Sequence, residues 1–164
     1  MATTDRPARS DRDKLASSAR MLTLALGIVF LAVGVVGFFI TGFDNVAGQT
    51  DEHLLFFEIN PLHNAVHLLL GIVGLALFRT TRGALLYGYI TAIGYGGAFL
   101  YGLFAMDKSW DVLSINTADN ILHLALAAVG IVLVGLGHAA LSAAPARSGS
   151  RTGFRAPGGG AAPA

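Results

Sequence analysis

The sequence predicts an all-α membrane protein with four transmembrane helices, arranged as two helical hairpins that form a parallel repeat. Of its 164 residues, 54% are hydrophobic and only 13% are charged, against roughly 25% charged in an ordinary soluble domain. Four long stretches contain no Lys, Arg, Asp or Glu, and two of them share a motif. We therefore expect a single domain that places its apolar surface in lipid.

The first span is expected at residues 21–43, an apolar stretch interrupted only by Thr23 and Thr41. At 1.5 Å per residue it reaches about 34 Å, which exceeds the bilayer core of about 30 Å. A cleaved signal peptide is the alternative, but its apolar region would be about twice the usual length. The other spans are expected at residues 61–78, 83–106 and 121–141.

Residues 1–20 are polar and basic, and residues 142–164 consist mainly of Ala, Pro, Gly, Ser and Arg. Neither segment has apolar periodicity, and both are predicted to be disordered tails. Ten of the eleven Lys and Arg residues lie in these tails or between the second and third spans; only Lys108 lies on the other side. Because basic residues favour the cytoplasmic side, we expect a multi-pass membrane protein with both termini in the cytoplasm.

Residues 60–78 align with residues 116–134 at a constant offset of 56, with eight identities in nineteen positions. The polar identities are the informative ones: Asn60/Asn116, Asn64/Asn120 and His67/His123. Glycines of the first and third spans also align, at an offset of 60, as Gly34/Gly94, Gly37/Gly97 and Gly42/Gly102. Each unit contains two spans, so both copies enter the membrane from the same side, as in parallel repeats.

Asn60, followed by Pro61, and Asn116 are predicted helix N-caps, because Asn is among the best capping residues and proline suits the first helical position. Further along each helix, polar and small residues recur on one face. In lipid such a stripe is expected to pack against another helix, either the equivalent stripe or the first and third spans. Its members are Asn64, His67, Gly71 and Gly74 in one helix and Asn120, His123, Ala127 and Gly130 in the other.

His67 and His123 lie about 10 Å inside the outer ends of their helices. The favoured hypothesis is a hydrogen-bonded structural pair, in a bundle with a structural, scaffolding or regulatory role. One alternative is a redox protein that binds haem between these histidines, and another is a conductor of protons, ions or small polar solutes. A metal site is the counterpart of the haem alternative: His63 precedes His67 by one turn, so His63, His67 and His123 could supply three nitrogens, although a histidine pair alone does not complete a metal shell.

The chain has no cysteine, which excludes disulfides and thiolate chemistry. It also lacks a phosphate-binding glycine loop, a zinc-protease motif and a serine-nucleophile elbow. We therefore predict no catalytic residue, no resident cofactor under the favoured hypothesis, and no nucleic-acid partner. The expected partners are the lipid bilayer and either a second copy or another membrane protein.

The doubled motif at residues 60–68 and 116–124 resembles a family of small four-helix bacterial membrane proteins, mainly actinobacterial, catalogued as a domain of unknown function. The resemblance covers roughly residues 21–141. It implies a four-span fold in the bacterial plasma membrane and brings no reaction with it.

Overall fold

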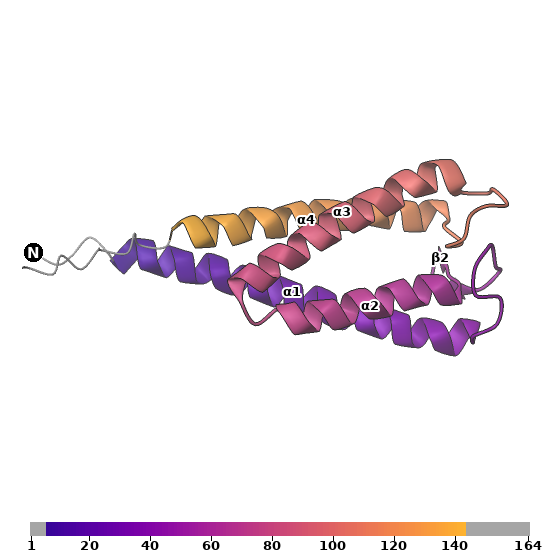
Figure 1. Cartoon of the computed structure of the whole chain (residues 1–164), viewed down its shortest axis with the longest axis horizontal. Coiled ribbons are helices and arrows are strands. Elements are labelled where there is room, and N and C mark those ends of the chain that lie inside the picture. The colour runs from indigo at the N-terminus through magenta and orange to yellow at the C-terminus, as the bar shows by residue number, and fades with distance from the viewer. Residues whose placement is uncertain (1–5, 144–164) are drawn as a thin grey trace, which may run out of the picture.

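The computed structural model describes residues 6–143, and within this range the chain forms four helices and one two-stranded hairpin (Figure 1). The helices are α1 (Arg6–Thr41), α2 (Pro61–Leu77), α3 (Thr81–Ala105) and α4 (Thr117–Ser142). The strands are β1 (His53–Leu54) and β2 (Phe57–Glu58), which pair antiparallel in the loop between α1 and α2. The predicted all-α fold is confirmed.

Three helices are long and apolar enough to cross a membrane: residues 11–41 of α1, all of α3 and all of α4. Helix α2 is apolar but has only 17 residues, or about 26 Å of rise. Large apolar side chains such as Phe39, Leu69 and Ile93 are more than half exposed on the outside of the bundle. A soluble monomer rarely exposes so much apolar surface, so the protein is a membrane protein.

Helix α1 starts well before the apolar stretch, and the prediction that residues 1–20 are disordered is therefore wrong from residue 6 onward. Residues 11–20 contain no glycine or proline, and Ala, Leu, Lys and Arg favour helix. Ala19 is completely buried in the core, and the Thr23 hydroxyl donates to its carbonyl over 2.9 Å. Residues 1–5 and 144–164, the rest of the predicted tails, lie outside the described residues.

Close pairing of α1 with α2 and of α3 with α4 forms two hairpins, which Figure 1 shows side by side. The small residues of the two stripes, such as Gly71 of α2 and Gly130 of α4, face α1 and α3, respectively, rather than each other. A Cβ at Gly71 would overlap the backbone of Leu31, and one at Gly130 would overlap the backbone of Ala92. At Gly74, the nearest atoms would belong to Gly27 and Tyr87, at 2.9–3.0 Å. These contacts bring the helix backbones close together, as small residues allow in membranes.

The glycine alignment at an offset of 60 is wrong. Gly37 packs against the Asn64 amide and Gly102 against the Asn120 amide, so these positions differ by 65. Gly94 and Gly97, which the alignment matched to Gly34 and Gly37, have open space where a Cβ would stand. The glycine spacing alone did not determine how far each helix slides along its partner.

The two outer loops are tied together by the predicted N-caps. The Asn60 side-chain oxygen accepts from the His63 backbone N–H over 2.8 Å, while its amide donates to the carbonyls of Gly48 and Val112, both at 2.8 Å. Asn116 likewise caps α4 and donates to the carbonyl of Phe56 over 2.8 Å. Each cap thus bonds to the loop of the other hairpin, which fixes the outer ends of α2 and α4 relative to each other.

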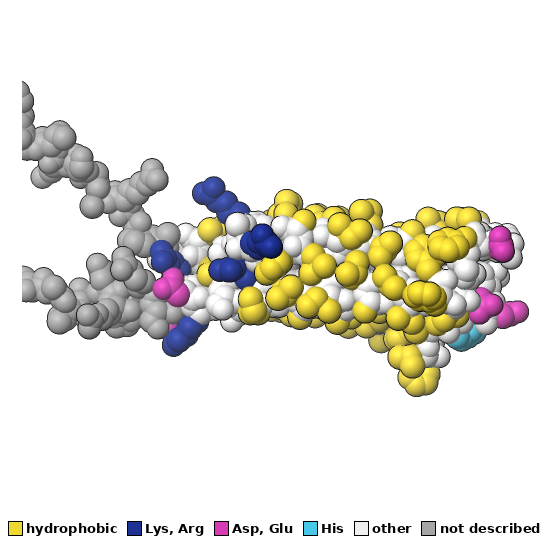
Figure 2. All heavy atoms as spheres, turned by 90° about the horizontal axis from the view of Figure 1, so that it is seen from below, with side chains coloured by type: hydrophobic (Ala, Val, Ile, Leu, Met, Phe, Trp, Pro, Cys, Tyr) yellow, Lys and Arg dark blue, Asp and Glu magenta, His cyan; other side chains and the backbone are white. Residues whose placement is uncertain are grey.

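Charge is separated along the bundle (Figure 2). Lys and Arg side chains gather, together with a few acidic ones, at the end where α1 begins. A band of hydrophobic side chains covers the middle, and the other visible Asp and Glu side chains lie at the opposite end. Among the described basic residues, only Lys108 belongs to an outer loop. This arrangement agrees with the charge separation found in the sequence.

Candidate functional site

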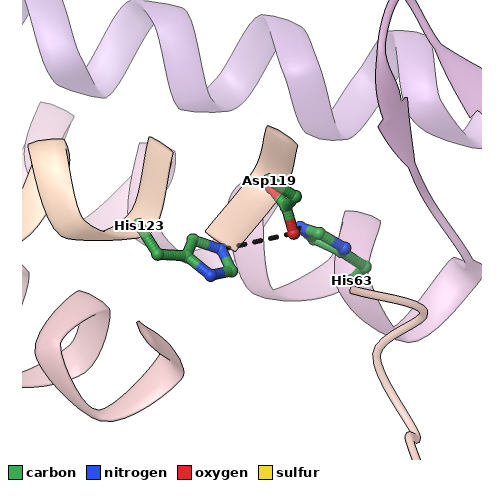
Figure 3. A group of neighbouring side chains, drawn as sticks. All are labelled: His63, Asp119 and His123. Carbon is green, nitrogen blue, oxygen red and sulfur yellow. Dashed lines mark ion pairs between the residues drawn. The ribbon is translucent and has the colours of Figure 1, made fainter. Parts of the chain in front are cut away.

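Four ionisable side chains meet in the centre of the bundle near the outer loops, and we call them the His/Asp cluster: His63 and His67 from α2, and Asp119 and His123 from α4. Each is at most 7% exposed. Figure 3 shows His63 and His123 on either side of Asp119, with imidazole nitrogens turned toward its carboxylate. The cluster therefore joins the two hairpins through side chains.

Local sequence explains where these side chains stand. His63 and Asp119 are the third helical residues after the caps Asn60 and Asn116, which bond to their backbone N–H groups. His67 and His123 follow one turn later on the same faces. Because His63 and Asp119 differ by the repeat offset of 56, the cluster consists of two sequence-equivalent pairs.

The hydrogen bonds of His63 determine its tautomer when the imidazoles are neutral. His63 Nδ1 lies 3.1 Å from the Leu113 carbonyl, which can only accept, so Nδ1 carries the proton. His63 Nε2 is then an acceptor, and His67 Nε2 donates to it over 3.0 Å. This leaves His67 Nδ1 to accept from the Tyr95 hydroxyl over 3.4 Å. Three side chains thus form one directed hydrogen-bonded chain.

Asp119 is not part of this hydrogen-bonded chain. Its Oδ2 lies 3.5 Å from His123 Nε2 and 3.8 Å from His63 Nε2, yet no hydrogen bond reaches this oxygen from the described residues. His123 Nδ1 is likewise buried without a hydrogen-bond partner in that part of the chain. Buried polar atoms are normally paired, so these two atoms mark a place where a further group is expected.

The His63, Asp119 and His123 side chains could hold a metal ion. Each offers one ligand atom, and the three atoms lie within 4.8 Å of one another. Donors around a tetrahedral zinc ion with bonds of 2.0–2.2 Å lie about 3.3–3.6 Å apart, so side-chain rotations would bring these three into range. His63 Nδ1 already donates to a backbone carbonyl, as the second nitrogen of a metal-bound histidine usually does.

The structure separates the residues that the sequence grouped into one polar stripe. Asn64 turns toward α1, where its amide donates to the Thr41 hydroxyl over 2.9 Å, and Asn120 turns toward Gly102 of α3. Neither asparagine belongs to the cluster.

The predicted His67–His123 pair has no direct hydrogen bond among the described residues. Both histidines instead contact the ring of Tyr95, at centroid distances of 6.3 and 5.5 Å.

Sequence reasoning missed the roles of His63, Asp119 and Tyr95. Asp119 does not stand out in the sequence, because the helix dipole favours an acidic residue in the first turn of a helix. Nothing in the spacing of Tyr95 points to the contact between its hydroxyl and His67. The signal for the first two was present, since the offset of 56 aligns His63 with Asp119.

The family described as Domain of unknown function (DUF4383) has a model that matches residues 20–151, most of the chain. The chain belongs to the DUF4383 family. This confirms the resemblance drawn from the doubled Asn/His motif at the level of the family. No curated protein and no solved structure matches the chain significantly. Membership in DUF4383 therefore supplies no activity, and the function has to be argued from the site.

Proposed function

We propose that this protein is a membrane-embedded bundle that binds a divalent transition-metal ion between its two hairpins, through His63, Asp119 and His123. The observation that carries the proposal is the buried Asp119 oxygen, which lies within 3.8 Å of a nitrogen from each histidine and has no hydrogen-bond partner among the described residues. Ionisable residues inside membrane spans are costly and are usually functional.

The donor set indicates which ions to expect. Imidazole suits zinc, copper, iron and nickel, whereas calcium and magnesium prefer oxygen ligands. Two histidines and one carboxylate form a familiar ligand set for zinc with one further position open. An ion here would neutralise the buried carboxylate and would join α2 to α4. A metal ion in this position would be compatible with the structural or regulatory function predicted from the sequence, because it would connect the two hairpins.

Binding would change one hydrogen bond. In the tautomer fixed by Leu113, His63 Nε2 has a single lone pair, and His67 donates to it. A metal ion on His63 needs the same lone pair, so the ion and the His67 hydrogen bond exclude each other. Metal binding would therefore release His67, which retains the Tyr95 hydroxyl as a neighbour.

The experiment is a zinc titration of protein purified in detergent, with His123→Gln as the test variant and His138→Gln as its control. His138 is exposed on the same helix and bonds to the Tyr89 hydroxyl, away from the cluster. The parent and His138→Gln should each bind one ion per chain, and His123→Gln should bind it at least about tenfold more weakly. Equal affinities in all three proteins would contradict the proposal.

Haem between His67 and His123 receives less support from the geometry. His67 Nε2 is already paired with His63, and the two cavities beside the cluster have volumes of only about 160 Å³ each. An absorption spectrum of the same purified sample tests this alternative, because bound haem would give a Soret band that His67→Leu removes.

Proton or solute conduction would depend on the chain from Tyr95 through His67 to His63. That chain ends on the Leu113 backbone carbonyl, which accepts a hydrogen bond but does not pass a proton on. A metal site would give the unpartnered Asp119 Oδ2 a partner, which conduction along this chain would not, and we therefore favour the metal site.

The proposed location is the plasma membrane, with both termini in the cytoplasm and the outer loops outside. The support is the distribution of Lys and Arg, ten of eleven on one side, together with the positive-inside rule. In this orientation the cluster lies near the external face, so an ion would enter from outside the cell.

A further inference from the structure

A cavity of about 160 Å³ lies between α1 and α4, directly beside the His/Asp cluster. Its walls are apolar: Val29, Phe30 and Val33 from α1, and Leu122 and Leu126 from α4. His63, His67 and Asp119 also line it, although their polar atoms contribute almost nothing to its surface. The metal proposal does not use this space.

The cavity faces the membrane rather than water. Val29 is 53% exposed, while Val33, Leu122 and Leu126 are half-buried, and all four lie within the apolar parts of their helices. The β1–β2 hairpin, through Leu54 and Phe57, closes the cavity on the side of the outer loops. A ligand would therefore enter sideways from the lipid, which requires a molecule that dissolves in membranes.

The volume of the cavity limits which part of a ligand can fit inside it. An apolar protein cavity of about 150 Å³ accommodates one benzene molecule, so this cavity fits a single six-membered ring. Phe30 provides an aromatic wall, with its ring centroid 5.5 Å from that of His67 and 5.3 Å from that of Tyr95. Offset or tilted packing of a further ring against Phe30 suits this arrangement. Any apolar tail would extend past Val29 into the lipid.

Asp119, one of the polar residues in the lining, determines which chemical group the ligand ring should carry. Asp119 is 2% exposed, and its Oδ2 is an acceptor without a hydrogen-bond partner in the described part of the chain. The ligand should therefore carry a donor, and a ring hydroxyl is the donor compatible with passage through lipid. A fatty-acid carboxylate fits less well, because its charge would face that of Asp119 when both are ionised.

We infer that this cavity binds the hydroxylated ring of a membrane-soluble phenol or quinol, with the ring hydroxyl donating to Asp119 and the apolar tail lying in the bilayer. The inference goes beyond the metal proposal, because it needs only the cavity and the acceptor oxygen. A bound metal ion would leave Asp119 a further lone pair, since an ionised carboxylate has about four acceptor positions.

The test is a calorimetric titration of the full chain in detergent with decylhydroquinone under anaerobic conditions, once with zinc and once with a chelator. Two further probes are decylbenzene and the dimethyl ether of decylhydroquinone, which keep the ring and the tail but donate no hydrogen bond. We expect the hydroquinone to bind at least about tenfold more tightly than either probe, since the buried acceptor stays unpaired with both. This comparison uses the parent protein and needs no variant to fold.

A pair of variants locates the site. Val33→Phe fills the cavity between α1 and α4, whereas Gly94→Leu adds bulk on α3, where a Cβ would meet nothing within 4 Å. Gly94 lines the second cavity, between α2 and α3, which does not reach Asp119. Hydroquinone binding should weaken at least about tenfold in Val33→Phe and stay within about twofold of the parent in Gly94→Leu.

Two results would overturn the inference. One is equal binding of the hydroquinone and its dimethyl ether, and the other is loss of binding in Gly94→Leu with retention in Val33→Phe. Because the titration is repeated with a chelator, absence of zinc binding would contradict the metal proposal and leave this test intact.

Discussion

Asp119 Oδ2 lies 3.8 Å from His63 Nε2, and the two residues occupy the same position in their helices, third after an asparagine cap. One hairpin thus supplies a carboxylate where the other supplies an imidazole. An exact repeat would have placed two like groups there, either two carboxylates that repel or two histidines. The difference between the copies makes the centre of the bundle a mixed donor set.

The His67 hydrogen bond to His63 gives a prediction about metal affinity. His67→Leu removes the donor that occupies His63 Nε2, so zinc should bind more tightly. A hydrogen bond contributes about 0.5–1.5 kcal/mol net, which corresponds to a decrease in Kd of about two- to tenfold. The measurement is the zinc titration described above, with His138→Gln as the control. If zinc binding instead weakened by about tenfold or more, His67 would belong to the ligand set, and the three-ligand site would be wrong.

The N-caps give a prediction about stability. Asn60→Asp keeps the oxygen that caps α2 but removes the amide that donates to Gly48 and Val112. The Gly48 carbonyl loses this donor, and the Val112 carbonyl keeps only the Gly48 backbone N–H, 3.2 Å away. Each hydrogen bond that is lost contributes about 0.5–1.5 kcal/mol net. We expect a clearly lower thermal unfolding midpoint in detergent, followed by circular dichroism.

Asn116→Asp is the matched comparison, because the Asn116 amide donates to one carbonyl rather than two. It should lower the unfolding midpoint less than Asn60→Asp does. Equal and small effects of both substitutions would show that the bonds between the outer loops contribute little to stability.

Helix packing can be tested with two glycines of α4. A Cβ at Gly130 would overlap the backbone of Ala92, whereas one at Gly135 would meet nothing within 4 Å. Gly130→Ala should lower the free energy of unfolding by about 1–3 kcal/mol, since backbone has to move. Gly135→Ala should be neutral or stabilising by up to about 1 kcal/mol, because alanine favours helix. The same direction and size of effect at both positions would contradict this packing.

The proposed orientation predicts which side chains can be labelled from outside the cell. The absence of native cysteine makes single-cysteine variants clean reporters. Glu52→Cys, in the loop between α1 and α2, should react with a membrane-impermeant maleimide on intact cells. Arg79→Cys, in the connection between α2 and α3, should react only after the membrane is opened. The reverse pattern would invert the topology.

Much of the fold follows from local sequence. The four helices, their approximate ends and both caps depend on apolar length and on residues next to each other in the chain. The early start of α1 was missed although residues 11–20 lack glycine and proline and favour helix. Only the burial of Ala19 depends on other helices. The sliding of α1 along α2 also escaped prediction, since the contacting glycines lie in different helices and their spacing in the sequence does not fix it.

The candidate site was only partly predictable for the same reason. His67 and His123 stood out as ionisable residues deep in spans, and their helix faces follow from helical periodicity. The meeting of His63 with Asp119 depends on how two hairpins cross and on the bonds that Asn60 and Asn116 make to the opposite loops. The crossing of the hairpins and the bonds between the loops cannot be predicted from the residue pattern of a single helix.

The central claim is that His63, Asp119 and His123 coordinate one metal ion, and X-ray absorption of the zinc-loaded protein tests it most directly. We expect a first shell of nitrogen and oxygen at about 2.0–2.2 Å, with outer-shell scattering from two imidazoles. In His123→Gln, this should fall to one imidazole, while His138→Gln should match the parent. A shell without imidazole scattering, or one that His123→Gln leaves unchanged, would contradict the claim.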